Sequence, residues 1–266
     1  MYKYLKIFFY SNSYQICRDI ILGWDLTTEN CRILVLHLNA KEPGVGIMLN
    51  IVFDYDGTLF NSIDVFAPVF RKAYYDATLK GLFPKKTWTD KKISRWMGHN
   101  SLTMRKEIAA HLSDTQWEEF TTGIKIAAAE MADWSKGRFF PGVVEVLRTF
   151  KERGYRLFIL SNCSNEYICI QRNLFDLDRY FTAYFCSGDY GWAPKKDILK
   201  LIKKEYSGQF IMVGDRLQDM EAANAQRILA IGCAYGYGDK DELNNADILI
   251  YQPMELLTVI PKVLKY

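Results

Sequence analysis

Short apolar runs alternate with segments of helical spacing through most of the chain. The run Ile51–Phe53 is too short for a helix, is β-branched and aromatic, and ends at a turn, so it predicts a buried parallel strand. Similar runs occur at residues 156–160, 184–186, 210–213, 228–231 and 247–250. A helix is predicted over 143–153, bracketed by Pro141 and Gly154. The alternation predicts an α/β fold with a doubly wound, Rossmann-like parallel sheet.

The segment 61–137 interrupts this alternation with helical patterns alone. Apolar residues at 63–77 follow three-and-four spacing, and Ser113 with Gln116 fits a capping box before a second apolar stripe at 117–134. We therefore expect an α-helical cap domain inserted into the α/β core, a position from which a lid can exclude water and contact a substrate. The tryptophans expected to pack inside this bundle are Trp96, Trp117 and Trp134.

Gly98 and His99 lie between two predicted helices of this segment, in a loop that can face the core. Isolated histidines are usually neither ligands nor catalysts, so we interpret His99 and His111 as ordinary surface or core residues.

The first 47 residues form a separate N-terminal extension. Lys6 interrupts an apolar run that is too short for a signal peptide or a membrane span. A strand is predicted over 33–38, and residues 41–46 read as a linker. The predicted domains are therefore the extension, 1–47, with no part in the chemistry; the α/β core, 48–60 and 138–266; and the cap domain, 61–137.

Composition excludes several classes of protein. The chain has 266 residues, 49% hydrophobic and 24% charged, with a formal net charge of +3, which is typical of a soluble globular protein. Its lysine pairs are dispersed, so no nucleic-acid partner is predicted, and no membrane association is predicted either. The six cysteines lie far apart without a CxxC pair, which favours reduced thiols in the cytoplasm over a zinc site or a disulfide framework.

Candidate chemistry begins where the first core strand ends. Asp54 and Asp56 follow this strand one residue apart, so their side chains can converge on one small volume. Two adjacent carboxylates repel unless one holds a proton or a cation lies between them. Gly57 permits a tight turn, and Thr58 adds an amide and a hydroxyl, so this strand end can hold a hard dication and a phosphate.

The string from Asp54 to Leu59 resembles the first motif of the haloacid dehalogenase superfamily, and the cap directly after it resembles the phosphoglycolate-phosphatase-like subgroup. Ser161 and Asn162, at the end of another strand, resemble the second motif. Lys195 resembles the family lysine, although Pro194 precedes it where many relatives have Lys-Pro, and Lys196 remains an alternative. Gly214 and Asp215 followed by Asp219 match the last motif, Gly-Asp-x-x-x-Asp.

The resemblance implies a magnesium-dependent phosphatase that hydrolyses a small phosphate monoester through an aspartyl-phosphate. In it Asp54 is the nucleophile, and Asp56 is the acid and base. Mg²⁺ is held by Asp54, the backbone carbonyl of Asp56 and Asp215, with Lys195 nearby. The residues implied to bind the phosphoryl group are Ser161 and the Gly57 and Thr58 amides, with Asn162 adjacent. Asp219 is a supporting acid, either behind the metal or paired with the lysine.

Other functions stay open at this stage. A phosphomutase acting on a sugar phosphate uses the same motifs, and a non-catalytic phosphate-binding protein can share the fold. Haloacid dehalogenation is disfavoured, because relatives with that chemistry typically lack the second aspartate and the magnesium site. Among small phosphorylated metabolites, phosphoglycolate, a nucleotide and a sugar phosphate remain candidates, and the sequence does not indicate the oligomeric state.

Overall fold

The computed structural model describes residues 22–23, 34–35, 48–99 and 101–263. The chain divides into two compact units, Met1–Gly46 and Ile47–Tyr266. In the first, β1 (Leu22–Gly23) pairs antiparallel with β2 (Leu34–Val35). The strand predicted over 33–38 therefore contains β2. The rest of that prediction, the linker at 41–46 and most of the predicted extension 1–47 lie outside the described residues.

The second unit is built around a six-stranded parallel sheet. In spatial order its strands are β10 (Ile248–Ile250), β9 (Leu229–Cys233), β8 (Gln209–Gly214), β3 (Leu49–Phe53), β6 (Arg156–Ser161) and β7 (Ala183–Cys186). Within this sheet β3 comes first in sequence, and the chain then adds β6 and β7 on one side of it. It crosses back to add β8, β9 and β10 on the other side of β3. The predicted doubly wound parallel sheet is confirmed, and its switch point lies between β3 and β8.

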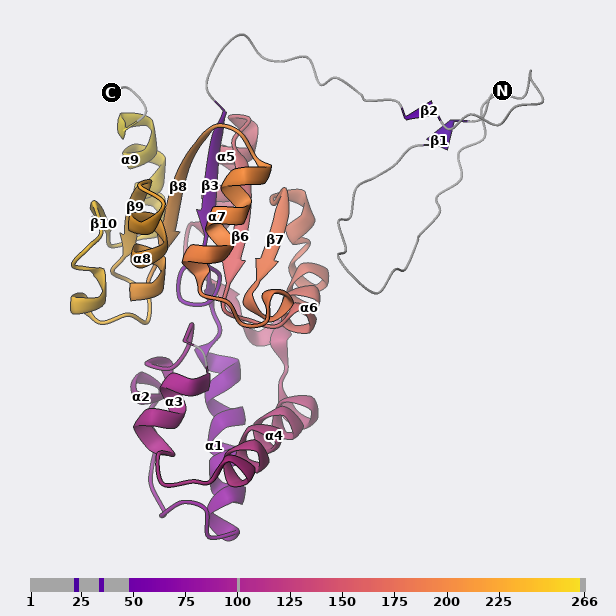
Figure 1. Cartoon of the computed structure of the whole chain (residues 1–266), viewed down its shortest axis with the longest axis vertical. Coiled ribbons are helices and arrows are strands. Elements are labelled where there is room, and N and C mark those ends of the chain that lie inside the picture. Colours follow the sequence, from indigo (N-terminus) through magenta and orange to yellow (C-terminus); the bar gives the residue numbers. More distant parts are fainter. Residues whose placement is uncertain (1–21, 24–33, 36–47, 100, 264–266) are drawn as a thin grey trace. The chain divides into compact units, whose positions relative to one another are not determined.

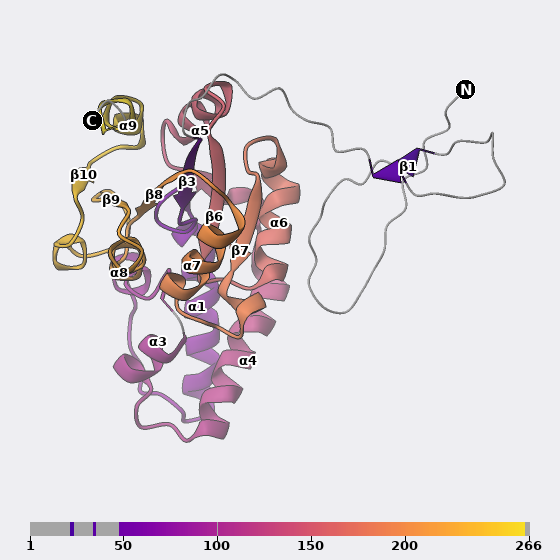
Figure 2. The same cartoon turned by 45° about the horizontal axis from the view of Figure 1, so that its top comes forward.

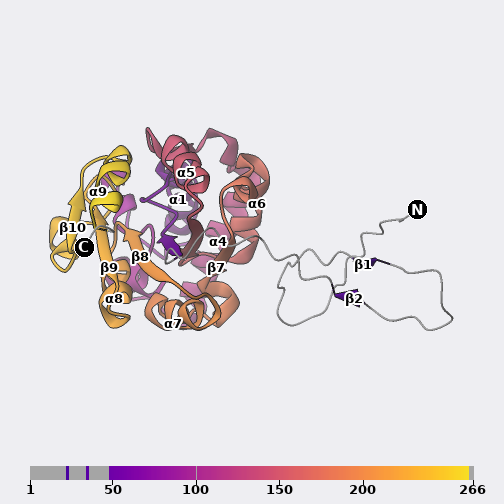
Figure 3. The ribbon, with the colours of Figure 1, turned by 90° about the horizontal axis from the view of Figure 1, so that it is seen from above.

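Helices cover both faces of this sheet, as Figure 3 shows from above. On one face α5 (Val143–Glu152), α6 (Asn165–Phe175) and α9 (Leu256–Val263) pack on the side chains of alternate strand positions. On the other face α7 (Lys195–Glu205) and α8 (Leu217–Ala225) cover the remaining positions. Because both faces are covered, every residue of β3 is buried, which explains its unbroken apolar run.

A helical insertion separates β3 from the rest of the core (Figure 1). It comprises α1 (Ile63–Leu79), α2 (Asp90–Ser94), α3 (Ser101–Ile108) and α4 (Asp114–Met131). The strands β4 (Phe60–Asn61) and β5 (Arg138–Phe139) pair antiparallel where the chain leaves the core and returns to it. The long helices α1 and α4 lie side by side in both Figure 1 and Figure 2, around an aromatic cluster of their own.

Two of the three tryptophans expected in that cluster lie there, and the third does not. Trp96 and Trp117 are buried among the insertion helices. Helix α4 ends at Met131, because Ala132 adopts an extended backbone, so the predicted stripe does not continue to Trp134. Trp134 instead packs edge-on against Tyr167 of α6, with ring centroids 5.0 Å apart. The prediction for Trp134 was therefore wrong.

Short 3-10 helices complete the described fold: η1 (Trp134–Lys136), η2 (Leu177–Arg179), η3 (Ser187–Tyr190), η4 (Lys240–Leu243) and η5 (Pro253–Glu255). Within the residues that the structure describes, no helix has the length and apolar character needed to cross a membrane.

Candidate active site

Asp54 and Asp215 lie next to each other at the carboxyl edge of the sheet. They directly follow β3 and β8, which are hydrogen-bonded neighbours with Phe53 opposite Val213. The Asp54 amide donates to the Val213 carbonyl at 2.9 Å, which continues the ladder past the strand end. Asp54 is 1% exposed and Asp215 is fully buried. The switch point of the sheet thus places two carboxylates in one dry volume.

Lys195, at the start of α7, supplies the balancing positive charge. Its Nζ donates to Asp54 Oδ1 at 2.5 Å and to Asp219 Oδ1 at 2.7 Å. Burial alone would lower the pKa of Lys195, but Asp219 and Asp54 outweigh burial and hold that pKa above its ordinary value. Lys196 is exposed. The structure therefore places Lys195, and not Lys196, against Asp54, and it pairs Asp219 with the lysine.

The three buried aspartates form a candidate metal site. Asp54, Asp215 and Asp219 each offer an oxygen, and these oxygens lie within 4.8 Å of one another. Burial raises the pKa of Asp54 against the opposing effect of Lys195, raises that of Asp219 to about 6, and raises that of Asp215 well above its usual value. One ammonium is too little charge for three carboxylates in such a place. A hard, oxygen-preferring dication fits this donor set.

Two observations mark where such a cation can be held. Asp54 Oδ2 is buried and has no hydrogen-bond partner among the described residues, and an orphaned carboxylate oxygen is costly unless a cation or a ligand binds it. The Asp56 side chain is not part of the acidic cluster. Within residues 48–99 and 101–263 no donor is recorded for the Asp56 backbone carbonyl, so this oxygen is available to a cation, and its role as a ligand stays a prediction.

Asp56 points its carboxylate towards α6. The hydroxyl of Tyr167 donates to Asp56 Oδ1 at 2.7 Å, and Trp134 packs against the Tyr167 ring. Burial raises the pKa of Asp56, although the neighbouring hydroxyls of Ser62 and Tyr167 act in the opposite direction. Asp56 is therefore a half-buried acid whose carboxylate is held by Tyr167, separate from the carboxylates that meet at Lys195.

Gly57 and Thr58 both contact the Asp215 carboxylate. Gly57 has φ +91°, and a Cβ there would overlap the Asp215 carboxylate, so only glycine fits. The Gly57 amide donates to the Phe60 carbonyl at 2.9 Å. This amide is therefore paired within the turn, and its part in binding a phosphoryl oxygen stays a prediction. The Thr58 hydroxyl donates to Asp215 Oδ1 at 3.1 Å, so it orients this acid.

The turn at residues 236–238 also packs against Asp215. The Tyr237 amide donates to Asp215 Oδ2 at 2.7 Å. A Cβ at Gly236 or Gly238, its two neighbours, would overlap Asp215. The Tyr237 hydroxyl lies 2.8 Å from Asn61 Oδ1, where the helical insertion begins. These contacts tie the orientation of Asp215 to the base of the insertion.

Ser161 and Asn162 lie at the end of β6, next to β3. Ser161 is 3% exposed. The Asn162 amide nitrogen donates to the Gly98 carbonyl at 2.9 Å, and Asn162 Oδ1 accepts from the Ser187 hydroxyl at 2.7 Å. Asn162 therefore connects the core to the loop of the insertion that contains Gly98.

Two further core side chains hold the same loop, residues 95–99. Arg216 Nη2 donates to the Arg95 carbonyl at 2.8 Å, and Gln218 Nε2 donates to His99 Nδ1 at 2.7 Å. Gly98 has φ +78°, and a Cβ there would lie 3.2 Å from Arg216 Cγ. We call the three bonds from Asn162, Arg216 and Gln218 the loop clasp. Each clasp residue is adjacent in sequence to a predicted site residue: Ser161, Asp215 or Asp219.

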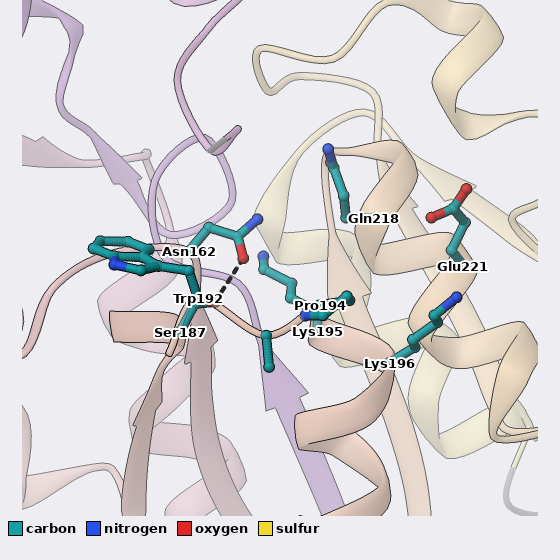
Figure 4. Close-up of a pocket in the computed structure, with 9 residues that line it drawn as sticks. Asn162, Ser187, Trp192, Pro194, Lys195, Lys196, Gln218 and Glu221 are labelled. Carbon is teal, nitrogen blue, oxygen red and sulfur yellow. Dashed lines mark hydrogen bonds between the residues drawn. The ribbon is translucent and has the colours of Figure 1, made fainter. Parts of the chain in front are cut away.

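A pocket of about 110 Å³ opens beside this cluster (Figure 4). Figure 4 shows Lys196 and Glu221 at one end of the pocket and Trp192 at the other. Asn162 and Lys195 line it, so the pocket reaches the buried lysine. Its size suits a small ligand, because pockets for drug-sized molecules are typically about 300 Å³ or more.

The structure thus brings together Asp54, Lys195, Asp215 and Asp219, with Gly57 and Thr58 beneath them. It also reveals residues that sequence reasoning missed. Tyr167 contacts Asp56 across 111 positions of sequence, and no local pattern marks it. Tyr237 did carry a signal, because glycines on both sides of an aromatic residue predict a close backbone approach.

The comparisons with known proteins agree with this geometry. The sequence pattern of the family described as "Haloacid dehalogenase-like hydrolase" matches residues 51–233. A phosphoglycolate phosphatase of Haemophilus influenzae is 24% identical, over 78% of this chain and 96% of its own. A phosphoglycolate phosphatase of Agrobacterium fabrum is 28% identical, over 71% of this chain and 81% of its own.

A similar fold occurs in a crystal structure described as a "predicted phosphatase" from Clostridium acetobutylicum. It has a TM-score of 0.70 and 20% identity, covering 82% of this chain and all of that one. The relatives confirm the resemblance to the phosphoglycolate-phosphatase-like subgroup. Because the family pattern spans well over half of the sequence, including β3, the insertion and β8, the chain belongs to the haloacid dehalogenase-like hydrolases.

Proposed function

We propose that the protein is a magnesium-dependent phosphatase that hydrolyses a small phosphate monoester through an aspartyl-phosphate on Asp54. The observation that supports this proposal most directly is the hydrogen bonding of the two oxygens of the Asp54 carboxylate. One of its oxygens is bound by Lys195 and the other is buried without a partner. Lys195 favours the ionised form of the carboxylate, against the effect of burial, and holds it in one orientation, which is what a nucleophilic aspartate requires.

Asp56 acts as general acid and then as general base. Burial raises its pKa, which favours the protonated form that the first step uses. Asp54 attacks the phosphorus while Asp56 gives its proton to the leaving oxygen. In the second step Asp56 takes a proton from the water that hydrolyses the aspartyl-phosphate. The Tyr167 hydroxyl binds Oδ1 of Asp56 and so leaves the other oxygen for proton transfer.

The metal site consists of Asp54 and Asp215 side chains and the backbone carbonyl of Asp56. Bound there, Mg²⁺ supplies positive charge against the negative charge that develops on the transferred phosphoryl group. Thr58 and the Tyr237 amide hold the Asp215 carboxylate in place through both of its oxygens. Asp219 supports the site by anchoring Lys195.

The phosphoryl oxygens bind to the Ser161 hydroxyl, the Thr58 amide and Lys195. The helical insertion serves as a cap, because the loop clasp holds residues 95–99 against the core beside these groups. A closed cap excludes water from the reacting atoms during the first step. The partner is a small phosphorylated metabolite, and the relatives make 2-phosphoglycolate the first compound to assay. The cytoplasmic location stays a prediction.

Release of inorganic phosphate from a panel of phosphate esters with Mg²⁺ tests the proposal. We expect turnover in the wild type and a loss of roughly 10³-fold or more in Asp54→Asn, because the amide is a poor nucleophile. Asp114→Asn is the matched control, since the Asp114 side chain is 94% exposed in the helical insertion. Near-wild-type turnover by Asp54→Asn would refute the assigned nucleophile. Transfer of phosphate within a sugar phosphate, without free phosphate, would indicate a mutase.

A further inference from the structure

Two free thiols face each other beside the candidate active site. Cys163 follows β6, and Cys186 is the last residue of the neighbouring strand β7. Their Sγ atoms lie 3.6 Å apart. Parallel pairing produces this contact, because Ser161 is opposite Cys186 in the sheet register. The two residues are 23 positions apart in sequence, so they do not form a CxxC motif and the sequence spacing does not predict their contact.

The two thiols differ in solvent exposure and in their surroundings, so they are suited to different steps of an oxidation. Cys163 is partly exposed, so an oxidant in solution can reach it, whereas Cys186 is 1% exposed. The hydrogen bond with Cys163 raises the pKa of the Cys186 thiol, and burial adds to the effect. The accessible sulfur is thus the one to be oxidised first, and the buried sulfur lies within reach to resolve it.

The pair also joins two loops that carry site residues. Cys163 follows Asn162, and Cys186 precedes Ser187. The Ser187 hydroxyl donates to Asn162 Oδ1, and Asn162 in turn holds the Gly98 carbonyl of the loop clasp. A bond between the two sulfurs therefore acts directly on the segment that contains Ser161 and Asn162.

We propose that Cys163 and Cys186 are a redox modification site that forms a reversible disulfide with a hydroperoxide as oxidant. The Cys163 thiolate attacks the O–O bond, an S–O bond forms, and the O–O bond breaks with release of hydroxide or alkoxide. The Cys186 sulfur then attacks Cys163 Sγ. An S–S bond forms, the S–O bond breaks, and the leaving hydroxide takes the Cys186 proton as water. Two thiols lose two electrons, and the hydroperoxide gains them.

Formation of this bond moves the site. A disulfide has an S–S distance of about 2.05 Å, so the two sulfurs must approach by roughly 1.5 Å. Asn162 and Ser161 move with Cys163, and a displacement of about 1 Å in an active site can cost a factor of about 100 in rate. Oxidation therefore reduces turnover. This consequence rests on the proposed phosphatase function, whereas the disulfide itself does not.

Peptide mass spectrometry after mild hydrogen peroxide treatment and thiol alkylation tests the modification site. The expected product is a cross-linked peptide pair containing Cys163 and Cys186, which dithiothreitol separates. Cys163→Ser and Cys186→Ser should each abolish it. Cys233→Ser should not, because the buried Cys233 lies in β9. Full alkylation of Cys163 after peroxide treatment, or its pairing with Cys169 instead of Cys186, would overturn the assignment.

Turnover of an aryl phosphate by the same samples tests the consequence. Oxidised wild type should lose at least tenfold in turnover and regain it with dithiothreitol, while Cys163→Ser keeps its turnover after peroxide. Unchanged turnover in a sample whose cross-link is proven would contradict the link to activity. If the reduced protein hydrolyses no phosphate ester, the proposed function fails, but the cross-link result is unaffected.

Discussion

His99 lies in loop 95–99 with 13% of its side chain exposed. Burial lowers its pKa from 6.5 to about 4, and the nearby charges of Arg216 and Lys195 act in the same direction. Glu242 Oε2 is 3.9 Å from His99 Nε2 and opposes them. At neutral pH the ring is therefore uncharged, and Nδ1 can accept the hydrogen bond from Gln218.

Stability should consequently depend on pH through His99. Its folded-state pKa lies below the unfolded value, so between pH 6.5 and about 4 the unfolded chain binds a proton that the folded chain does not. Stability then falls as the pH decreases through this window. Urea unfolding gives the free energy of unfolding at pH 7.5 and at pH 5. This free energy should decrease between the two pH values by about 1 kcal/mol more in the wild type than in His99→Gln, after allowance for solvent screening. Equal losses would contradict the buried neutral ring.

At this scale, sequence motifs located the acids and the lysine, because each directly follows a strand or begins a helix. For Asp54 and Asp215 the strand end and the family motif were enough, whereas the motif left Lys195 and Lys196 both open, and only the structure shows which of them contacts Asp54. The partner of Asp56 could not be found this way. Tyr167 belongs to a helix far along the chain, and only the packing of α6 on the sheet brings its hydroxyl to Asp56.

At the scale of elements, loop 95–99 matters because core and insertion meet there through specific hydrogen bonds. Gly98 lies within this loop in a left-handed conformation, against the aliphatic stem of Arg216. Arg216 is 2% exposed and held at its Nη2 end by the Arg95 carbonyl, so it has little freedom to move aside.

Gly98→Ala and Gly81→Ala form a matched pair of variants. Gly81 has φ +77°, close to the +78° of Gly98, but nothing lies within 4 Å of a Cβ there. Both substitutions should destabilise the protein by about 1 kcal/mol through backbone strain. Only Gly98→Ala presses on Arg216 and should lower kcat/KM, by about tenfold. Equal kcat/KM values for the two variants would show that the loop clasp does not support catalysis.

Sequence patterns predicted the core strands well, since each is a buried apolar run with a turn at its end. They were less reliable in the helical insertion. The apolar stripe of α4 continues past the end of the helix, and the backbone leaves the helix at Ala132 before Trp134 is reached. Periodicity alone does not indicate such an end, because the ring of Trp134 packs against Tyr167 of another element.

For the whole molecule, folding and metal binding should be coupled. The sheet concentrates Asp54, Asp215 and Asp219 in a buried volume, and Lys195 balances only part of their charge. Doubly wound topology was predictable from the alternation of strands and helices. The convergence of these acids followed from that topology, because neighbouring parallel strands end at the same edge.

Thermal unfolding with EDTA and with Mg²⁺ tests this coupling. Mg²⁺ should raise the Tm of the wild type by several degrees, since a ligand that binds only the folded state stabilises it. Mg²⁺ should not raise the Tm of Asp215→Asn, because this variant lacks a carboxylate that the proposed metal site needs. A Tm increase with Mg²⁺ in Asp215→Asn as large as in wild type would place the metal elsewhere.

Trapping the covalent intermediate tests the central claim most directly. In Asp56→Asn the water that hydrolyses the aspartyl-phosphate has no base, so the adduct should accumulate when the substrate is an aryl phosphate, whose leaving group needs no proton from Asp56, and Mg²⁺ is present. Borohydride reduces an aspartyl-phosphate to homoserine, which peptide mass spectrometry can locate. The account predicts homoserine at position 54 and none when Mg²⁺ is omitted. Turnover with homoserine absent, or found at another aspartate, would contradict it.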